Sequence, residues 1–371
     1  MSGSRQLFAN PAFDLSAYPP RLGSYGAVFI MLKSALGAGL LNFPWAFEKA
    51  GGVTTAISVE LVSLVFLISG LVILGYASSV SRQKTYQDVV REVCGRAVGQ
   101  LCEVCFCFNL YMISVAFLVV VQDQLEKCDE SEVPHHWYTD QRFALFIMCL
   151  LIILPLSIPK EIGIQKYTSD RQAHSENACV SSSVGSWASM FSVVPTICFG
   201  FQCHEACIAI YSSMENQKLC HWVIISVLSM LFCLLIYTLT GVYGYMTFGQ
   251  TVASDILMSY PGDDVVMIIS RLLFGISIVT IYPIILLLGR CVFFFDVSCL
   301  CGSRSVILNL IVLLTVAWIT STLLIAMFVP DMADVISVIG GISAFFIFIF
   351  PGMKNVALSL SSLIRINISE I

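Results

Sequence analysis

Long apolar stretches, separated by short polar ones, make up most of this chain. Windows that are long enough and nearly free of charge to cross a bilayer fall at about residues 25–47, 53–77, 100–122, 143–159, 187–212, 222–246, 265–289, 305–328 and 333–350. In lipid the backbone must satisfy its own hydrogen bonds, and a helix does so within one segment. The pattern predicts an all-α polytopic membrane protein with about nine spans.

The composition excludes a soluble protein and a nucleic-acid-binding one. Hydrophobic residues make up 57% of the 371 positions and charged residues only 12%, whereas a soluble domain carries about 25% charge. The net charge of -5 comes without a basic block, so no nucleic-acid partner is expected. Most cysteines lie inside apolar stretches, where Cys acts as a small hydrophobe. The lipid bilayer is the expected surrounding.

The loop charges predict an orientation and expose an inconsistency. Basic residues between the second and third windows, against acidic residues at 123–142, place the N-terminal tail (1–24) in the cytoplasm. Five basic residues after position 187 also fall on one side, but counting crossings puts that side outside; they are Lys218, Arg290, Arg304, Lys354 and Arg365. One crossing is therefore missing. Residues 160–186 carry six charges, each costing about 2.5–3.5 kcal/mol at the bilayer centre, so this segment is predicted to be a polar loop.

Two windows contain residues near the middle that weaken an α-helix. Gly37-Ala38-Gly39 lies about 12 residues into the first window, and Gly200 lies about 13 into the fifth, after Pro195. Matched interruptions in two halves of a chain are the best sequence pointer to the binding site of a secondary transporter. Freed N–H groups suit a carboxylate and freed carbonyls suit a cation. The alternative is that the small residues only let helices pack closely.

Five motifs carry a resemblance to a known family. They are Lys33-Ser34-Ala35-Leu36-Gly37-Ala38-Gly39-Leu40-Leu41-Asn42-Phe43-Pro44, Phe199-Gly200-Phe201-Gln202-Cys203-His204-Glu205, Thr240-Gly241-Val242-Tyr243-Gly244, Val279-Thr280-Ile281-Tyr282-Pro283 and Ile339-Gly340-Gly341-Ile342-Ser343. Over residues 25–352 the chain resembles the sodium-coupled neutral amino-acid transporters, solute carrier family thirty-eight of the amino acid/auxin permeases.

The resemblance implies eleven spans, the first ten forming two inverted five-helix repeats of the leucine-transporter type. Two departures follow. The fifth span is absent after Tyr167-Thr168-Ser169, and the eleventh is absent after Phe350-Pro351-Gly352, where a tail (353–371) begins. The expected fold is an incomplete inverted-repeat bundle, with residues 25–352 as its transporter domain and the loop at 160–186 replacing a span.

The resemblance also implies site residues. The substrate carboxylate would meet the backbone around the first break, and the rest of the amino acid would meet the second; the residues are Gly37, Ala38, Gly39, Leu40, Phe199, Gly200, Phe201 and Gln202. A sodium ion would bind the Leu36 carbonyl with Ser277 and Thr280, whose hydroxyls otherwise make ordinary interhelical hydrogen bonds. Sodium is the coupling ion, and no cofactor is expected.

Two side chains near the breaks, Lys33 and His204, are expected to modulate ion or substrate binding. Lys33 stands where the family often has Asn, so its ammonium could occupy the cation's place; alternatively it pairs with Glu60 or reaches toward the cytoplasm. His204 is either a pH-sensitive group or a structural hydrogen-bonding residue. Cys203, His204 and Cys207 do not share a helical face with a second ligand pair, so no metal site is predicted.

These features predict a secondary active transporter of small neutral amino acids, such as glutamine and alanine, most simply in the plasma membrane. No nucleophile and base pair indicates an enzyme. The competing hypotheses are a non-transporting amino-acid receptor or scaffold and an inactive splice product.

Overall fold

The computed structural model describes residues 22–128, 141–157, 193–297, 304–329 and 331–353. Within these ranges the chain is helical, and its only β pairing is an isolated bridge. The elements are α1 (Ser24–Ala35), α2 (Gly39–Lys49), α3 (Val53–Ser81), α4 (Tyr86–Cys94), α5 (Arg96–Cys128), α6 (Gln141–Met148), η2 (Cys149–Ile153), α7 (Leu154–Ser157), α9 (Val194–Gly200), α10 (His204–Ser213), α11 (Leu219–Phe248), η3 (Gly249–Thr251), α12 (Ile256–Ser259), α13 (Val265–Val297), α14 (Arg304–Phe328), α15 (Met332–Ala344) and η4 (Phe345–Ile349).

The predicted all-α membrane fold is confirmed. Six described helices are long and apolar enough to cross a membrane, and the bent pair α1–α2 makes a seventh. The two remaining windows are also helical, as α6–η2–α7 and α9–α10. The total of about nine crossings stays a prediction. The polar loop at 160–186 and most of both tails lie outside the described residues.

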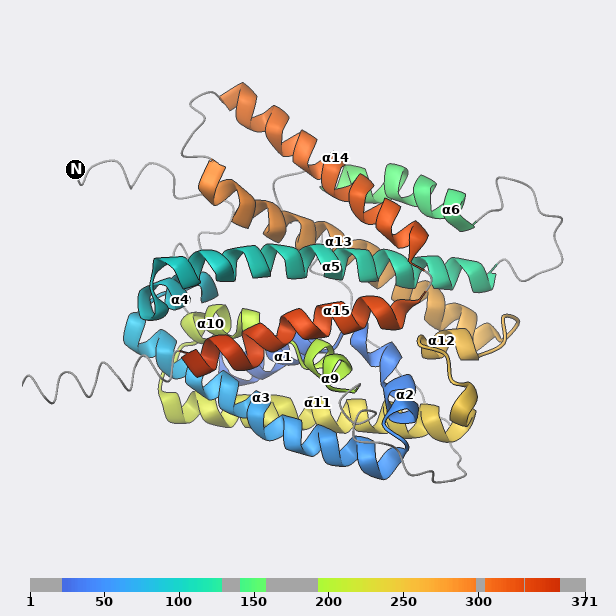
Figure 1. Ribbon diagram of the computed structural model, residues 1–371, viewed down its shortest axis with the longest axis horizontal. Helices are drawn as coiled ribbons and strands as arrows, with labels where there is room; N and C mark the ends of the chain where they lie inside the picture. Colours follow the sequence, from blue (N-terminus) through green and yellow to red (C-terminus); the bar gives the residue numbers. More distant parts are fainter. Residues whose placement is uncertain (1–21, 129–140, 158–192, 298–303, 330, 354–371) are drawn as a thin grey trace, which may run out of the picture.

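The broken helices lie at the centre of the bundle. Figure 1 shows α1, α2, α9 and α10 between α15 and α5 on one side and α3 and α11 on the other. The contacts agree, since α9 packs on α15 and both α1 and α2 pack on α11. Gly340 of α15 lies directly on Pro195 of α9, at a spacing that leaves no room for a side chain.

The two broken pairs run antiparallel. Leu22, before α1, pairs with the end of α10: its N–H donates to the Ser213 carbonyl (3.3 Å), and its carbonyl accepts from the N–H of Glu215 (3.2 Å). At the other end α2 packs on α9. The first half of one pair therefore lies beside the second half of the other, which is the relation that an inverted repeat requires.

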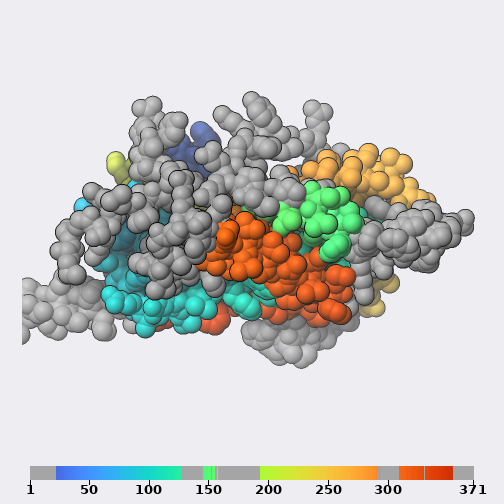
Figure 2. Space-filling view, turned by 90° about the horizontal axis from the view of Figure 1, so that it is seen from above, coloured from blue at the N-terminus to red at the C-terminus, as the bar shows by residue number. Residues whose placement is uncertain are grey.

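A second layer of helices covers α5. The second layer consists of α13, α14 and α6, which all contact α5. Figure 2 shows α14 and α6 at the face turned toward the reader. Many outward side chains are large and apolar, including Val65 (64% exposed) and Leu272 (64% exposed). A surface of this kind is stable against lipid tails and not against water.

Two short helices were not among the expected elements. Helix α4 follows α3, with Thr85 capping its N-terminus by accepting from the Asp88 N–H, and α12 follows η3, with Asp255 as its cap. Both were too short and polar to register in a search for spans. They connect spans on the outside of the apolar windows.

Candidate functional site

The first break separates α1 from α2, which meet at an angle of 62°. Leu36 ends α1 in an extended conformation, and Ala38 precedes α2. Within the described residues the N–H groups of Ala38 and Gly39 donate to no backbone carbonyl, whereas the next two amides do: Leu40 N–H bonds to Gly37 and Leu41 N–H to Ala38. The break thus leaves adjacent free donors at the N-terminus of α2.

The second break runs from Phe201 to Cys203. Pro195 opens α9, which ends at Gly200, and α10 begins at His204. Between them the Gln202 N–H reaches the Phe199 carbonyl (3.3 Å) in a tight turn. Both sequence-predicted interruptions are therefore real helix breaks.

Glycine brings the two breaks into direct contact. A Cβ atom placed on Gly39 would lie 2.9 Å from the Cα of Gly200 and 3.2 Å from Cδ1 of Phe199. Two backbones approach this closely only where a side chain is missing. The predicted substrate residues of the first and second breaks are therefore neighbours.

Tyr237 of α11 joins the two breaks. Its hydroxyl lies 2.9 Å from the Ala35 carbonyl and 2.9 Å from the Gly200 carbonyl, both among the carbonyls freed where a half-helix ends. Its ring stacks on Phe43 with centroids 4.2 Å apart and packs on Phe201. The sequence analysis missed this residue, because nothing in the local sequence links position 237 to either break.

A polar network lies beside the second break. Oε1 of Glu205 accepts from Nδ2 of Asn109 (2.7 Å) and from Nε2 of Gln202 (2.8 Å). Oε1 of Gln202 accepts from the Ser343 hydroxyl (2.8 Å), which also lies 2.8 Å from the Ile339 carbonyl. The network connects α5, the break and α15. Of its members only Gln202 was predicted as a site residue, although a carboxylate inside an apolar window is itself a signal of function.

The predicted substrate residues differ in accessibility. Gly37 is exposed, Leu40 and Gln202 are half-buried, and the remaining five are buried: Ala38, Gly39, Phe199, Gly200 and Phe201. Phe201 is 0% exposed. In this conformation its ring is part of the packing between the breaks and does not line an open space.

The structure does not bring the predicted sodium ligands together. Ser277 and Thr280 are exposed on α13, and the Thr280 hydroxyl donates within its own helix to the Ser277 carbonyl (2.7 Å). Helix α13 packs chiefly on α5 and α14, whereas Leu36 belongs to α1, which packs on α10 and α11. A sodium site of this composition requires α13 and α1 to approach each other.

Lys33 and His204 occupy contrasting positions. Lys33 is exposed and forms no ion pair with Glu60, which instead accepts from the Thr238 hydroxyl (2.8 Å). The suggested pairing of Lys33 with Glu60 is therefore wrong. His204 is fully buried, and its Nε2 lies 3.0 Å from the Leu67 carbonyl, which favours the structural role.

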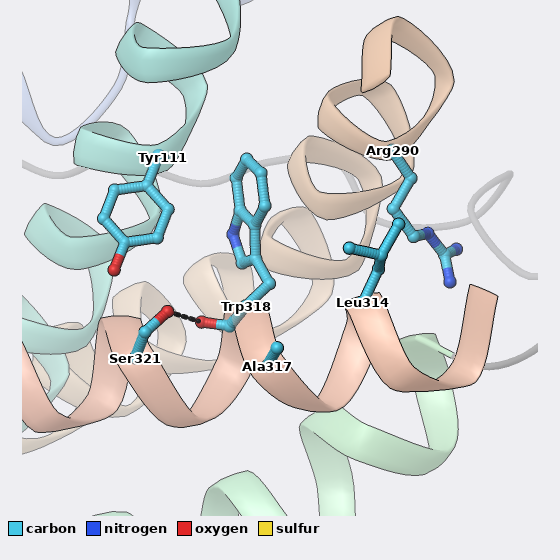
Figure 3. Close-up of a pocket in the computed structure, with 6 residues that line it drawn as sticks. All are labelled: Tyr111, Arg290, Leu314, Ala317, Trp318 and Ser321. Atoms are coloured by element: carbon cyan, nitrogen blue, oxygen red, sulfur yellow. Dashed lines mark hydrogen bonds between the residues drawn. The ribbon is translucent and has the colours of Figure 1, made fainter. Parts of the chain in front are cut away.

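Two other features of the described residues lie apart from the breaks. A cavity of about 190 Å³ between α5, α13 and α14 is lined by Tyr111, Arg290, Leu314, Ala317, Trp318 and Ser321 (Figure 3). No group of three or more His, Cys, Asp or Glu side chains suited to a metal ion occurs among the described residues.

Known proteins match this chain over most of its length. The family model described as "Transmembrane amino acid transporter protein" matches residues 22–170 and 162–369. Human "Solute carrier family 38 member 8" is 56% identical, covering 95% of this chain and 88% of its own length, and the mouse protein of the same name is 54% identical over 91% and 85%. "Sodium-coupled neutral amino acid transporter 7" of Danio rerio is 41% identical over 96% and 84%.

Proposed function

This chain belongs to the transmembrane amino acid transporter family, and on that premise we propose that it carries small neutral L-amino acids, of the glutamine and alanine class, together with sodium. It is a multi-pass membrane protein of a family that moves its substrate across the bilayer and does not convert it chemically. The substrate class, the coupling to sodium and a plasma-membrane location form the proposal.

The contact between the two helix breaks is the observation that carries the proposal. The free N–H groups of Ala38 and Gly39 lie at the N-terminus of α2. A helix N-terminus carries a partial positive charge and unsatisfied donors, which suit a carboxylate. Every amino acid has a carboxylate, so this end of the site would hold the common part of the substrate.

Selectivity for neutral side chains has a second source of support. Phe199, Phe201 and Gln202 surround the other break and provide two aromatic rings and one neutral amide. Such groups can contact an apolar or amide side chain without leaving a charge unpaired. The amide of Gln202 is held by hydrogen bonds at both its ends, which would fix its orientation toward a substrate.

Alternating access would act through the same breaks. Each half-helix can tilt independently of its partner, because no continuous ladder of hydrogen bonds crosses residues 36–38 or 201–203. Movement of α1 or α10 would open the site to one side of the membrane while α2 and α9 stay closed.

Sodium coupling rests on the names of the relatives and on the oxygen atoms available. The Leu36 carbonyl and the hydroxyls of Ser277 and Thr280 are neutral acceptors of the kind that suits sodium. Because Ser277 and Thr280 are exposed on α13, we expect sodium to favour a conformation in which α13 approaches α1.

Exchange of labelled glutamine in proteoliposomes tests the proposal. The purified chain, reconstituted with unlabelled glutamine inside, should accumulate labelled glutamine when sodium is present outside and much less when choline replaces it. Thr280→Ala should weaken the sodium dependence, and Thr320→Ala, on the exposed face of α14, serves as the matched control. Binding of glutamine without exchange would instead support a receptor.

A further inference from the structure

Glu205 is a half-buried carboxylate at the second helix break, and no described basic residue pairs with it. It lies in the first turn of α10, and only its Oε1 atom accepts hydrogen bonds, from Asn109 and Gln202. Among the described residues no Lys, Arg or His forms an ion pair with it. Both of its donors are neutral amides, so the negative charge is not balanced.

The titratable groups on the surrounding elements are engaged elsewhere. The elements that pack on α10 carry several such groups. His204 of α10 itself bonds to the Leu67 carbonyl of α3, Glu60 of α3 accepts from Thr238, and Tyr86 of α4 bonds to the Phe346 carbonyl. Arg91 of α4 pairs with Glu103 of α5, and Lys33 of α1 is exposed. Cys102 of α5 and Cys207 of α10 lie near Tyr86 as well. None of these groups donates to Glu205.

A lone carboxylate at this depth is costly unless a cation reaches it. The side chain is half-buried, so the described residues do not enclose it completely. Its Oε2 atom accepts no hydrogen bond from a described group. A metal cation is a poor fit, because the amides of Asn109 and Gln202 turn their N–H₂ groups, not their oxygens, toward the carboxylate.

We propose that Glu205 is a proton-binding site whose occupancy controls how tightly the second helix break is held to α5 and α15. A hydronium ion transfers its proton to Oε2: one O–H bond of the hydronium breaks, a water molecule is left, and the carboxylate becomes a neutral carboxylic acid with a new O–H bond. No electron is transferred. Charge-assisted hydrogen bonds are roughly twice as strong as neutral ones, so protonation weakens the links to Asn109 and Gln202.

A second atom supports this assignment. Oδ1 of Asn109 is buried and has no hydrogen-bond partner among the described residues. If the amide turns over, this oxygen can accept the new O–H of the protonated acid, in exchange for the bond that Nδ2 now donates to the carboxylate. Buried acceptors without a donor are rare, and this one is placed to accept from the protonated form.

The consequence is a link between proton binding and the substrate site. Gln202 belongs both to the network and to the set of residues expected to contact the substrate, and Ser343 holds its other end. When Glu205 is charged, Gln202 is fixed. When it is neutral, Gln202 and the turn at 201–203 are released, so affinity for the amino acid should depend on pH. This last step rests on the proposed function.

Infrared titration and ligand-induced stabilisation test the two parts separately. In nanodiscs, the carboxylic-acid C=O absorption of the parent chain that is lost between mildly acidic and mildly alkaline buffer should contain a component that is absent in Glu205→Gln. The rise in Tm caused by glutamine should correspond to an affinity that changes with pH by roughly fivefold or more, and Glu205→Gln should remove this dependence. Glu60→Gln is the control, because that carboxylate bonds to Thr238 of α11 and takes no part in the network of Asn109, Gln202 and Ser343.

The outcomes are distinguishable. An infrared titration identical in the parent and Glu205→Gln would overturn the proton site, whether or not glutamine binds. Loss of the band with an unchanged pH dependence of glutamine binding would overturn the link to the substrate. If glutamine binds to none of the proteins, the proposed substrate is wrong, and the infrared result still decides the proton site.

Discussion

Gly39 sets the spacing between two helices by the absence of a side chain. Since its Cβ would lie 2.9 Å from the Gly200 Cα, Gly39→Ala must push α2 away from α9. Overpacking of this kind costs about 1–3 kcal/mol. We expect a lower Tm in detergent and at least a tenfold loss of glutamine affinity.

Gly37 provides the matched comparison. No atom lies within 4 Å of the Cβ position of Gly37, so Gly37→Ala should keep both stability and binding. Gly37→Leu should keep stability but fill the position expected for the substrate carboxylate, and so lose binding. Equal effects of Gly37→Ala and Gly39→Ala would contradict the role given to the contact between the breaks.

Tyr237→Phe isolates one hydroxyl. The substitution retains the stacking on Phe43 but removes the donor shared by the Ala35 and Gly200 carbonyls. Leaving a buried acceptor unsatisfied costs about 1–3 kcal/mol. Thermal unfolding should show this loss, while Tyr243→Phe on the same helix, whose ring is 40% exposed, should be close to neutral. Equal stability of both variants would argue against the bridge.

At the scale of elements, the short helix α12 is fastened at both ends. Asp255 caps its N-terminus by accepting from the Leu257 N–H (2.8 Å) and also accepts from Gln124 of α5 (2.6 Å). At its other end, Nη2 of the buried Arg271 donates to the carbonyls of Leu257, Tyr260 and Pro261.

The cap makes α12 sensitive to pH. Burial raises the pKa of Asp255 from 3.8 to about 7, although the Leu257 N–H, Gln124 and Arg271 partly oppose the shift. Between these values the folded state holds a proton that the unfolded segment has lost, so stability falls as pH rises from about 4 to about 7. We expect α12 to open more readily in mildly alkaline than in mildly acidic buffer.

Hydrogen exchange of the peptide containing α12, corrected for intrinsic exchange rates, measures this opening. Asp255→Asn should make it independent of pH, because the amide keeps an acceptor for Leu257 and Gln124 can turn its Oε1 toward the new N–H₂. Asp263→Asn changes an exposed acid nearby and should leave the pH dependence intact. An unaltered profile in Asp255→Asn would show that another group titrates.

The sequence predicted those features of the site that depend on local backbone. Gly37–Gly39 and Pro195–Gly200 mark the breaks because glycine and proline weaken a helix wherever they occur. The partners of the breaks were not predictable in this way. Tyr237 lies 202 residues from Ala35, and Asn109 lies 96 from Glu205. Only the packing of α11 and α5 against the breaks selects these residues from many similar ones.

For the whole molecule, the segment between α7 and α9 is where the sequence predicts a departure from the family. The family model matches the chain in two pieces that overlap at residues 162–170. The alignment with the human relative extends over 390 positions, more than this chain contains, so it includes gaps. The missing crossing stays a prediction.

Restoring that segment should improve transport. A version that carries the expected fifth span between Ser169 and Asp170 should take up glutamine faster and leave the endoplasmic reticulum more completely. Without it, either the following helices insert against their charge bias or six charges enter the bilayer. Protease accessibility of tags at positions 175 and 371 would report the number of crossings. Robust concentrative uptake by the 371-residue chain alone would refute this prediction.

Tyr237 has one hydroxyl proton and two carbonyl acceptors at equal distance. The proton can be donated fully to only one of them at a time, so the hydroxyl can favour either the end of α1 or the end of α9. If either half-helix withdraws, the proton settles on the other carbonyl and the electron density of the ring changes. A fluorinated tyrosine at this position would therefore act as a built-in sensor, its resonance frequency showing which of the two broken helices has moved.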